Sequence, residues 1–144
     1  MAWSLAQDRA RRIRDLRYDL HFTIPPDPGT RIDGHVTIRF TLTDATRPLA
    51  LDFSESGALR ARIGDRAITL TASGDHIVIA PADLREGANE IAISFIAGDA
   101  SLNRNPEFMY TLFVPARARL AFPCFDQPDL KARYTLSLDI PGGW

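Results

Sequence analysis

Histidine and cysteine are the side chains of this sequence that could hold a metal ion or attack a substrate. The histidines are His21, His35 and His76, and no two of them are four residues apart, the spacing that places two imidazoles on one helix face for zinc. None of them is followed by glutamate. They are therefore interpreted as strand histidines at the surface of the protein.

Cys124 is the single cysteine, and it lies in the apolar run of residues 121–125. An apolar environment raises the pKa of a thiol, so we predict a buried core cysteine rather than a nucleophile. One cysteine permits no internal disulfide, and a reducing cytoplasm fits slightly better than a secreted location. With no phosphate loop and no nucleophile-elbow pattern either, the sequence assigns no catalytic residue and no metal ligand to this chain.

The elements that position these residues are predicted from the spacing of apolar side chains. Apolar and polar residues alternate over residues 16–24 and 32–42, which is typical of half-buried strands. Gly34 replaces an apolar residue in the second series and is expected to mark a bulge or a bend. Short helical pieces are predicted near residues 5–14 and 129–131. Further strands are predicted at residues 49–53, 59–63, 67–70, 77–80, 91–96 and 133–140.

Strands of this length at roughly ten-residue spacing, mostly separated by turn signals, indicate an antiparallel sandwich or layered sheet. No long helical period interrupts them, which argues against parallel βαβ units. The length of 144 residues is near the modal size of one domain. The sequence therefore predicts a single all-β domain over residues 1–144, with at most short helical pieces.

Composition excludes two classes of partner. A net charge of −1 gives no electrostatic driving force for binding nucleic acid. No apolar run approaches the ~18 residues that would span a membrane, and the N-terminus turns polar too early for a signal peptide. The arginines near the N-terminus are interpreted as a solvated helical turn leading into a strand, rather than as a basic arm for an anionic partner. These are Arg9, Arg11, Arg12, Arg14 and Arg17.

Residues 102–131 hold the most distinctive pattern in the chain. Three prolines fix the backbone, and an apolar plug lies between two of them. Asp126 follows this plug, near enough in sequence for Arg117 or Arg119 to pair with it. A rigid, irregular and partly apolar loop usually presents a surface to another body. The prolines are Pro115, Pro123 and Pro128, and the plug consists of Phe122, Cys124 and Phe125.

One part of this segment resembles a known protein family. It is the run Phe122-Pro123-Cys124-Phe125-Asp126-Gln127-Pro128, which is preceded by Ala118-Arg119 and followed by Lys131-Ala132 and a strand. It resembles the N-terminal domain of the aminopeptidase N family of zinc metallopeptidases, which also includes leukotriene A hydrolase. Weaker matches extend the resemblance over most of the chain. They are Tyr18, Leu20, Gly34, Val36, Leu49, Leu51, Asp52, Phe53, Leu84, Gly87 and Asn89.

The resemblance implies a saddle-like β domain that packs on a thermolysin-like catalytic domain of the same polypeptide. That domain would hold zinc on an H-E-x-x-H helix and grip the N-terminus of a peptide substrate, and neither motif occurs here. We therefore expect this chain to be inactive alone and to hold no zinc. The chain stops at Trp144, a large aromatic residue just after a strand, and a further part is expected to follow it.

A substrate-binding role is implied for one short stretch. The family's N-terminal domain helps to wall the pocket for the first substrate residue. Many relatives place Gln or Glu there, eight residues before the Phe of the Phe-Pro-Cys run, in contact with the substrate amine. Val114 has that position here, and Tyr110 and Leu112 share its face if the backbone is extended. Either the missing domain alone recognises the amine, or the enzyme prefers a more apolar first residue.

The three residues of this stretch, Tyr110, Leu112 and Val114, are thus expected to wall the pocket and to be partly exposed here. The alternative places them in the core of this domain. Two other functions also stay open. One is a stand-alone β-sandwich module for a peptide or glycan, with Trp3, Tyr110 and Trp144 as a platform. The other is the same domain of an epoxide hydrolase like leukotriene A hydrolase.

Overall fold

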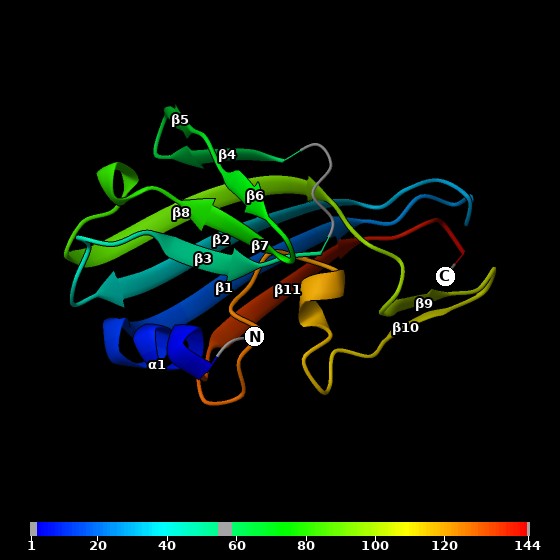
Figure 1. Ribbon diagram of the computed structural model, residues 1–144. Helices are drawn as coiled ribbons and strands as arrows, with labels where there is room; N and C mark the ends of the chain where they lie inside the picture. Colours follow the sequence, from blue (N-terminus) through cyan, green and yellow to red (C-terminus); the bar gives the residue numbers. More distant parts are fainter. Residues whose placement is uncertain (1–2, 55–58, 144) are drawn as a thin grey trace.

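The computed structural model describes residues 3–54 and 59–143 of the chain (Figure 1). Strands make up 46% of these residues and helices 12%, so the prediction of an all-β domain with short helical pieces is confirmed. The elements in chain order are α1 (Trp3–Arg12), β1 (Ile13–Thr23), β2 (Asp33–Leu42), β3 (Leu49–Asp52), β4 (Arg60–Ile63), β5 (Arg66–Ile68), β6 (Thr71–Ser73), β7 (His76–Ile79), η1 (Pro81–Asp83), β8 (Gly87–Ile96), β9 (Leu102–Arg104), β10 (Met109–Thr111), η2 (Ala118–Leu120) and β11 (Arg133–Asp139).

The largest sheet has the strand order β11-β1-β2-β8-β4-β5. Its neighbouring strands pair antiparallel, except that β11 runs parallel to β1. A three-stranded sheet, β3-β7-β6, lies over this sheet, and the hairpin β9–β10 lies near the C-terminal end of the chain (Figure 1). None of the helices in residues 3–54 and 59–143 has the length and apolar character needed to cross a bilayer.

The core lies between the two sheets because alternate residues of each strand point to the same face. On β2 these are Val36, Ile38 and Phe40, and on β8 they are Ile91, Ile93 and Phe95. The facing strands β3 and β7 contribute the side chains that close the layer. These are Leu49, Leu51, Ile77 and Ile79, all fully buried. Every second residue of these strands is thus buried, with the same spacing of two residues from which the strands were predicted.

The first strand begins earlier than its alternation predicts. Its pairing with β2 slips by one residue between Arg14 and Arg17, and Asp15 there has a φ angle of 53°. This β-bulge places Ile13 and Leu16 in the core although they are three residues apart. A strict period of two therefore starts only at Leu16.

Gly34 marks neither a bulge nor a bend, so that prediction is wrong. It lies in regular register between Phe22 and Phe95. A Cβ atom at Gly34 would lie 2.3 Å from Cε2 of Phe95, which shows that the glycine makes room for this ring. The Phe95 ring packs edge-on against Phe22 and Phe53, with ring centroids 6.2 and 5.5 Å apart. The glycine is required by packing rather than by backbone conformation.

Other differences concern short elements. Residues 127–130 form a turn closed by the Leu130 N–H, which donates to the Gln127 carbonyl, and the helical piece predicted at residues 129–131 is wrong. Strands β6, β9 and β10 have three residues each, too few for a recognisable alternation. Trp144, part of the predicted aromatic platform, lies outside the described residues.

Substitution of Gly34 by alanine is expected to lower the free energy of unfolding by about 1–3 kcal/mol, the usual cost of overpacking a core. Urea denaturation followed by circular dichroism measures the change. Gly142→Ala is the matched control, since a Cβ there meets nothing within 4 Å. Equal stability of the two variants would contradict the packing role, whereas recovery in Gly34→Ala/Phe95→Leu would support it.

Candidate functional site

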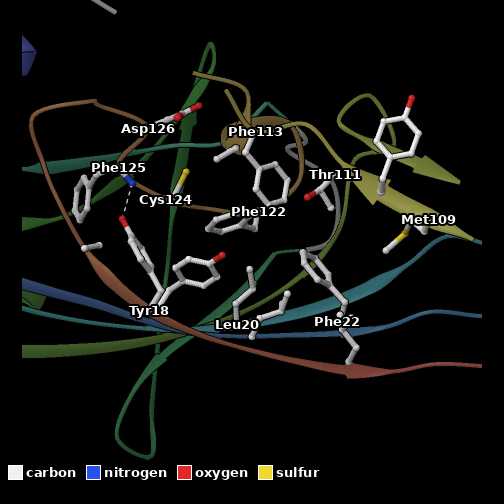
Figure 2. A pocket seen from close by; sticks show the side chains of 16 residues that line it. Tyr18, Leu20, Phe22, Met109, Thr111, Phe113, Phe122, Cys124, Phe125 and Asp126 are labelled. Carbon is white, nitrogen blue, oxygen red and sulfur yellow. Dashed lines mark hydrogen bonds between the residues drawn. The ribbon is translucent and has the colours of Figure 1, made fainter. Parts of the chain in front are cut away.

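The run of residues 122–128, here called the motif loop, is tied to two strands by hydrogen bonds. Asp52, the last residue of β3, donates its N–H to the Cys124 carbonyl (2.7 Å), and its own carbonyl accepts from the Cys124 N–H (3.1 Å). The Phe125 N–H donates to the buried Tyr18 hydroxyl of β1 at 2.9 Å (Figure 2). An irregular loop is thereby fixed against the core.

A buried ion pair joins the motif loop to the N-terminal helix. Arg9 of α1 is fully buried, and its guanidinium donates two hydrogen bonds to the Asp52 carboxylate, at 2.7 and 2.9 Å. The same carboxylate accepts the N–H of Asp126 at 2.8 Å. The Arg9 guanidinium also lies 5.4 Å from the ring centroid of Phe125. One carboxylate thus connects α1, β3 and the motif loop.

The interpretation of the N-terminal arginines as solvated is wrong for Arg9 and Arg12. Both are buried, while Arg11, Arg14 and Arg17 are exposed. Arg12 donates to the carbonyls of residues 44, 47 and 48 and to the Asp8 carboxylate. Residues three apart share a helix face. This spacing of Arg9 and Arg12 is the sequence signal that could have identified the inward pair.

Asp126 carries the single charge of the motif loop. Its carboxylate accepts the Arg119 N–H at 3.1 Å and lies 3.8 Å from the Arg119 guanidinium, so the predicted pairing is confirmed for Arg119. Arg117 donates instead to the Ala100 carbonyl. Burial raises the pKa of Asp126, and the charge of Asp52 adds to this effect against the lowering by Arg119.

Cys124 is buried, as predicted, and its backbone pairs with that of Asp52 in β3. Burial raises the pKa of its thiol well above the ordinary value, and the carboxylates of Asp126 and Asp52 act in the same direction. The thiol therefore stays protonated at neutral pH and is a poor nucleophile. Its role in this structure is packing.

The three histidines do not form one cluster. His21 and His35 are cross-strand partners on the outer face of the large sheet, where His21 Nε2 lies 3.0 Å from Asp139 Oδ2. His76 lies on β7, with Nδ1 2.8 Å from Asp52 Oδ1. Across residues 3–54 and 59–143, no three His, Cys, Asp or Glu side chains are arranged to hold a metal ion. The described residues therefore do not fit a zinc ion.

An apolar groove of about 510 Å³ lies between the large sheet and the segment that leads into the motif loop. Tyr18, Leu20 and Phe22 of β1 rise from its floor toward Phe113 and Phe122 (Figure 2). The lining is mostly apolar and suits an apolar group. The other lining residues are Met109, Tyr110, Thr111, Ala118, Cys124, Phe125, Asp126, Ala132, Tyr134, Leu136 and Leu138.

The three residues predicted to wall a pocket are exposed. The exposed fractions are 55% for Tyr110, 49% for Leu112 and 76% for Val114. The alternative, that they belong to the core of this domain, is therefore wrong. Tyr110 lines the apolar groove, whereas Leu112 and Val114 do not. Their role in walling a substrate pocket stays a prediction.

Sequence reasoning missed the part of the groove formed by β11. Tyr134, Leu136 and Leu138 alternate as in a half-buried strand, yet all three are exposed. They continue the face of Tyr18, Leu20 and Phe22, to which they are paired in register. Ile140, which directly follows this strand, is exposed as well.

Comparison with known proteins gives a consistent answer. The family model described as the Peptidase M1 N-terminal domain matches residues 14–142. Two probable M1 family aminopeptidases, 1 and 2, of Encephalitozoon cuniculi are 34% and 33% identical over alignments of 140 and 139 positions, and each alignment covers 85% of this chain. The chain spans about one sixth (16%) of the length of these curated relatives.

Solved structures share the fold. An M1 zinc metallopeptidase from Deinococcus radiodurans has a TM-score of 0.66 and 17% identity, covering 89% of this chain and 32% of that one. Native leukotriene A4 hydrolase from Saccharomyces cerevisiae has a TM-score of 0.70 and 19% identity, covering 96% and 27% of the two chains.

Replacing Arg9 by methionine is expected to destabilise the fold by about 3–5 kcal/mol, because the Asp52 carboxylate stays buried without its cation. Chemical denaturation measures the loss. Arg11→Met on the same helix is the control, and its exposed side chain predicts a change within about 0.5 kcal/mol. A similar small effect of both substitutions would show that the ion pair does not hold the motif loop.

Proposed function

Because the chain belongs to the M1 peptidase family as its N-terminal domain, we propose that it is part of a zinc metalloaminopeptidase that removes N-terminal residues from peptides. The match of the family model to residues 14–142 carries this proposal. The longer protein is called the parent below. In it, this domain is the non-catalytic partner of a catalytic domain in the same polypeptide.

The zinc chemistry belongs to that catalytic domain. Support comes from the relatives, which are zinc metallopeptidases in the solved structures, and from the described residues of this chain, which do not fit a zinc ion. The zinc would polarise the scissile carbonyl and activate a water molecule. We expect this chain alone to be inactive. A cytoplasmic location belongs to the same proposal and is compatible with the free thiol of Cys124.

This domain contributes a wall to the pocket for the first substrate residue. The proposed wall consists of Tyr110, Leu112 and Val114, and their exposure leaves them available to a neighbouring domain. The motif loop that follows them is fixed to the core through Asp52. Residues 115–121, which connect the wall to the motif loop, are therefore anchored at one end. A fixed support of this kind suits a surface that must position a ligand.

The side chains of this wall set the preference of the pocket. Val114 and Leu112 offer no acceptor for an ammonium group, so recognition of the substrate amine falls to the catalytic domain. Their apolar surface favours an apolar first residue. The apolar character of the neighbouring groove, which Tyr110 also lines, supports this preference.

The first test is the reaction of the parent. Its coding sequence should contain H-E-x-x-H beyond residue 144, and the purified parent should hydrolyse leucyl-p-nitroanilide and lose activity when zinc is chelated. The 144-residue chain should not hydrolyse it. Absence of both the motif and this activity would favour a stand-alone binding module. Hydrolysis of an allylic epoxide without anilide hydrolysis would favour an epoxide hydrolase.

The second test concerns the wall. Val114→Gln in the parent supplies an acceptor for the substrate amine, and kcat/KM for leucyl-p-nitroanilide should rise by about tenfold, the effect of a hydrogen bond to a charged group worth ~1.5 kcal/mol. Thr69→Gln, an exposed substitution outside the proposed wall, is the control. An unchanged kcat/KM in both variants would reject Val114 as part of the pocket without affecting the aminopeptidase assignment.

A further inference from the structure

Residues 113–117 form a loop that carries Val114 of the proposed wall, and this loop is here called the wall loop. Its ends are joined by the Arg117 N–H, which donates to the Phe113 carbonyl at 3.0 Å. Within the loop, Ala116 has a φ angle of 48°, a left-handed conformation that is unfavourable for a residue with a Cβ atom. A residue in this conformation persists only where surrounding contacts hold it. Contacts from outside the wall loop are therefore needed to keep its shape.

Two arginine side chains supply these contacts. Arg117 Nη2 donates to the Ala100 carbonyl at 2.7 Å, and Arg119 Nη1 donates to the Ala116 carbonyl. The Arg119 guanidinium also lies near the Asp126 carboxylate, which connects the wall loop to the motif loop. The Arg117 guanidinium connects the wall loop to a different part of the chain, 17 residues away in sequence. The wall loop is thus held by two separate parts of the domain.

The acceptor of the Arg117 side chain lies in a turn that is anchored in the core. This turn comprises residues 99–102 and is closed by a hydrogen bond between the backbones of its first and last residues. Ser101 in the turn is fully buried, and its carbonyl accepts the Leu112 N–H at 2.9 Å. The turn therefore fixes the proposed wall at two points, through the Leu112 backbone ahead of the wall loop and through the Arg117 side chain at its end.

Val114 lies between these two attachment points. Leu112 is two residues before it and Arg117 is three residues after it, and both bond to the same turn. Because Arg117 bonds through its side chain, one substitution can remove its attachment and leave the backbone bond of Leu112 in place. The end of the wall loop would then lose its link to the turn, and the position of Val114 would be less well defined.

We propose that Arg117 is a positioning residue of the parent, which holds the wall loop against the turn of residues 99–102 and so places Val114 for contact with an apolar first residue of the substrate. This inference rests on the function proposed for the wall. Arg117 acts through Val114 and does not itself contact the substrate. A wall contact of this kind is made equally with the bound substrate and with the transition state, so it affects KM rather than kcat.

Steady-state kinetics of the parent tests this role. Arg117→Met removes the donor, and KM for leucyl-p-nitroanilide should rise about fivefold while kcat changes less than about twofold, the effect of losing one hydrogen bond from a charged group. KM for glycyl-p-nitroanilide should stay unchanged, because glycine has no side chain to meet the wall. Arg117→Lys keeps a cationic donor and should recover most of the affinity. Arg85→Met is the matched control, since Arg85 is exposed and donates to the Ala88 carbonyl at 2.7 Å, outside the wall.

The kinetic outcomes separate this inference from the proposed function. Equal rises in KM for the leucyl and glycyl substrates, or no rise for the leucyl substrate, would overturn the positioning role. If Val114→Gln changes kcat/KM while Arg117→Met changes neither KM, the wall assignment stands and Arg117 alone is rejected. If the parent hydrolyses neither anilide, the proposed function fails, and the effect of Arg117 on substrate binding fails with it.

Hydrogen exchange followed by NMR tests the structural part of the inference without any activity. In the 144-residue chain, the amides of Leu112 and Arg117 should exchange about fivefold faster in Arg117→Met than in Arg85→Met, because the wall loop opens more often. In Arg117→Met the amide of residue 117 is that of the introduced methionine. The amides of β2 and β8 should exchange at equal rates in both variants, which shows that the fold is intact. Equal exchange at positions 112 and 117 in the two variants would overturn the positioning role.

Discussion

The buried carboxylate of Asp52 is the group on which the motif loop depends. It accepts two hydrogen bonds from Arg9 and one from the Asp126 N–H, while the backbone of Asp52 pairs with Cys124. A buried ion pair contributes little net stability over apolar packing, but losing one partner is costly. We infer that the pair specifies where α1, β3 and the motif loop meet. The loop has little regular structure of its own. The hydrogen bonds of Asp52 therefore fix its position, as repeated backbone hydrogen bonds would do for a strand in a sheet.

The position of the motif loop in turn determines the shape of the apolar groove. Phe122 packs edge-on against Tyr18 and Phe113, with ring centroids 6.1 and 5.7 Å apart. Tyr18 is itself held by the Phe125 N–H. The aromatic side chains of the sheet and of the segment 113–122 are thus connected through the loop. A shift of the loop would move the wall residues that precede it, which links the buried charges to the proposed function.

Much of the fold could be predicted from the sequence because the core strands follow a strict period of two, as in residues 16–24 and 32–42. The failures have separate physical causes. The bulge at Asp15 shifts the period and hides the start of β1. Gly34 is explained by the ring of Phe95, which lies 61 residues away in sequence. Arg9 and Arg12 can be buried because carbonyl and carboxylate groups of residues 44–52 accept their hydrogen bonds. No local pattern near the N-terminus reveals these distant acceptors.

The candidate site shows the same limit most clearly at β11. Its alternation of apolar and polar residues is the alternation of β1, and the two strands are paired in register. Yet the apolar side chains of β1 are buried and those of β11 are exposed. Alternation specifies which side chains share a face, whereas burial requires a second layer over that face. In the described part of the chain, the second layer covers β1 but not β11. The three apolar side chains of β11 therefore line the groove without being buried, although the sequence pattern of this strand is that of β1.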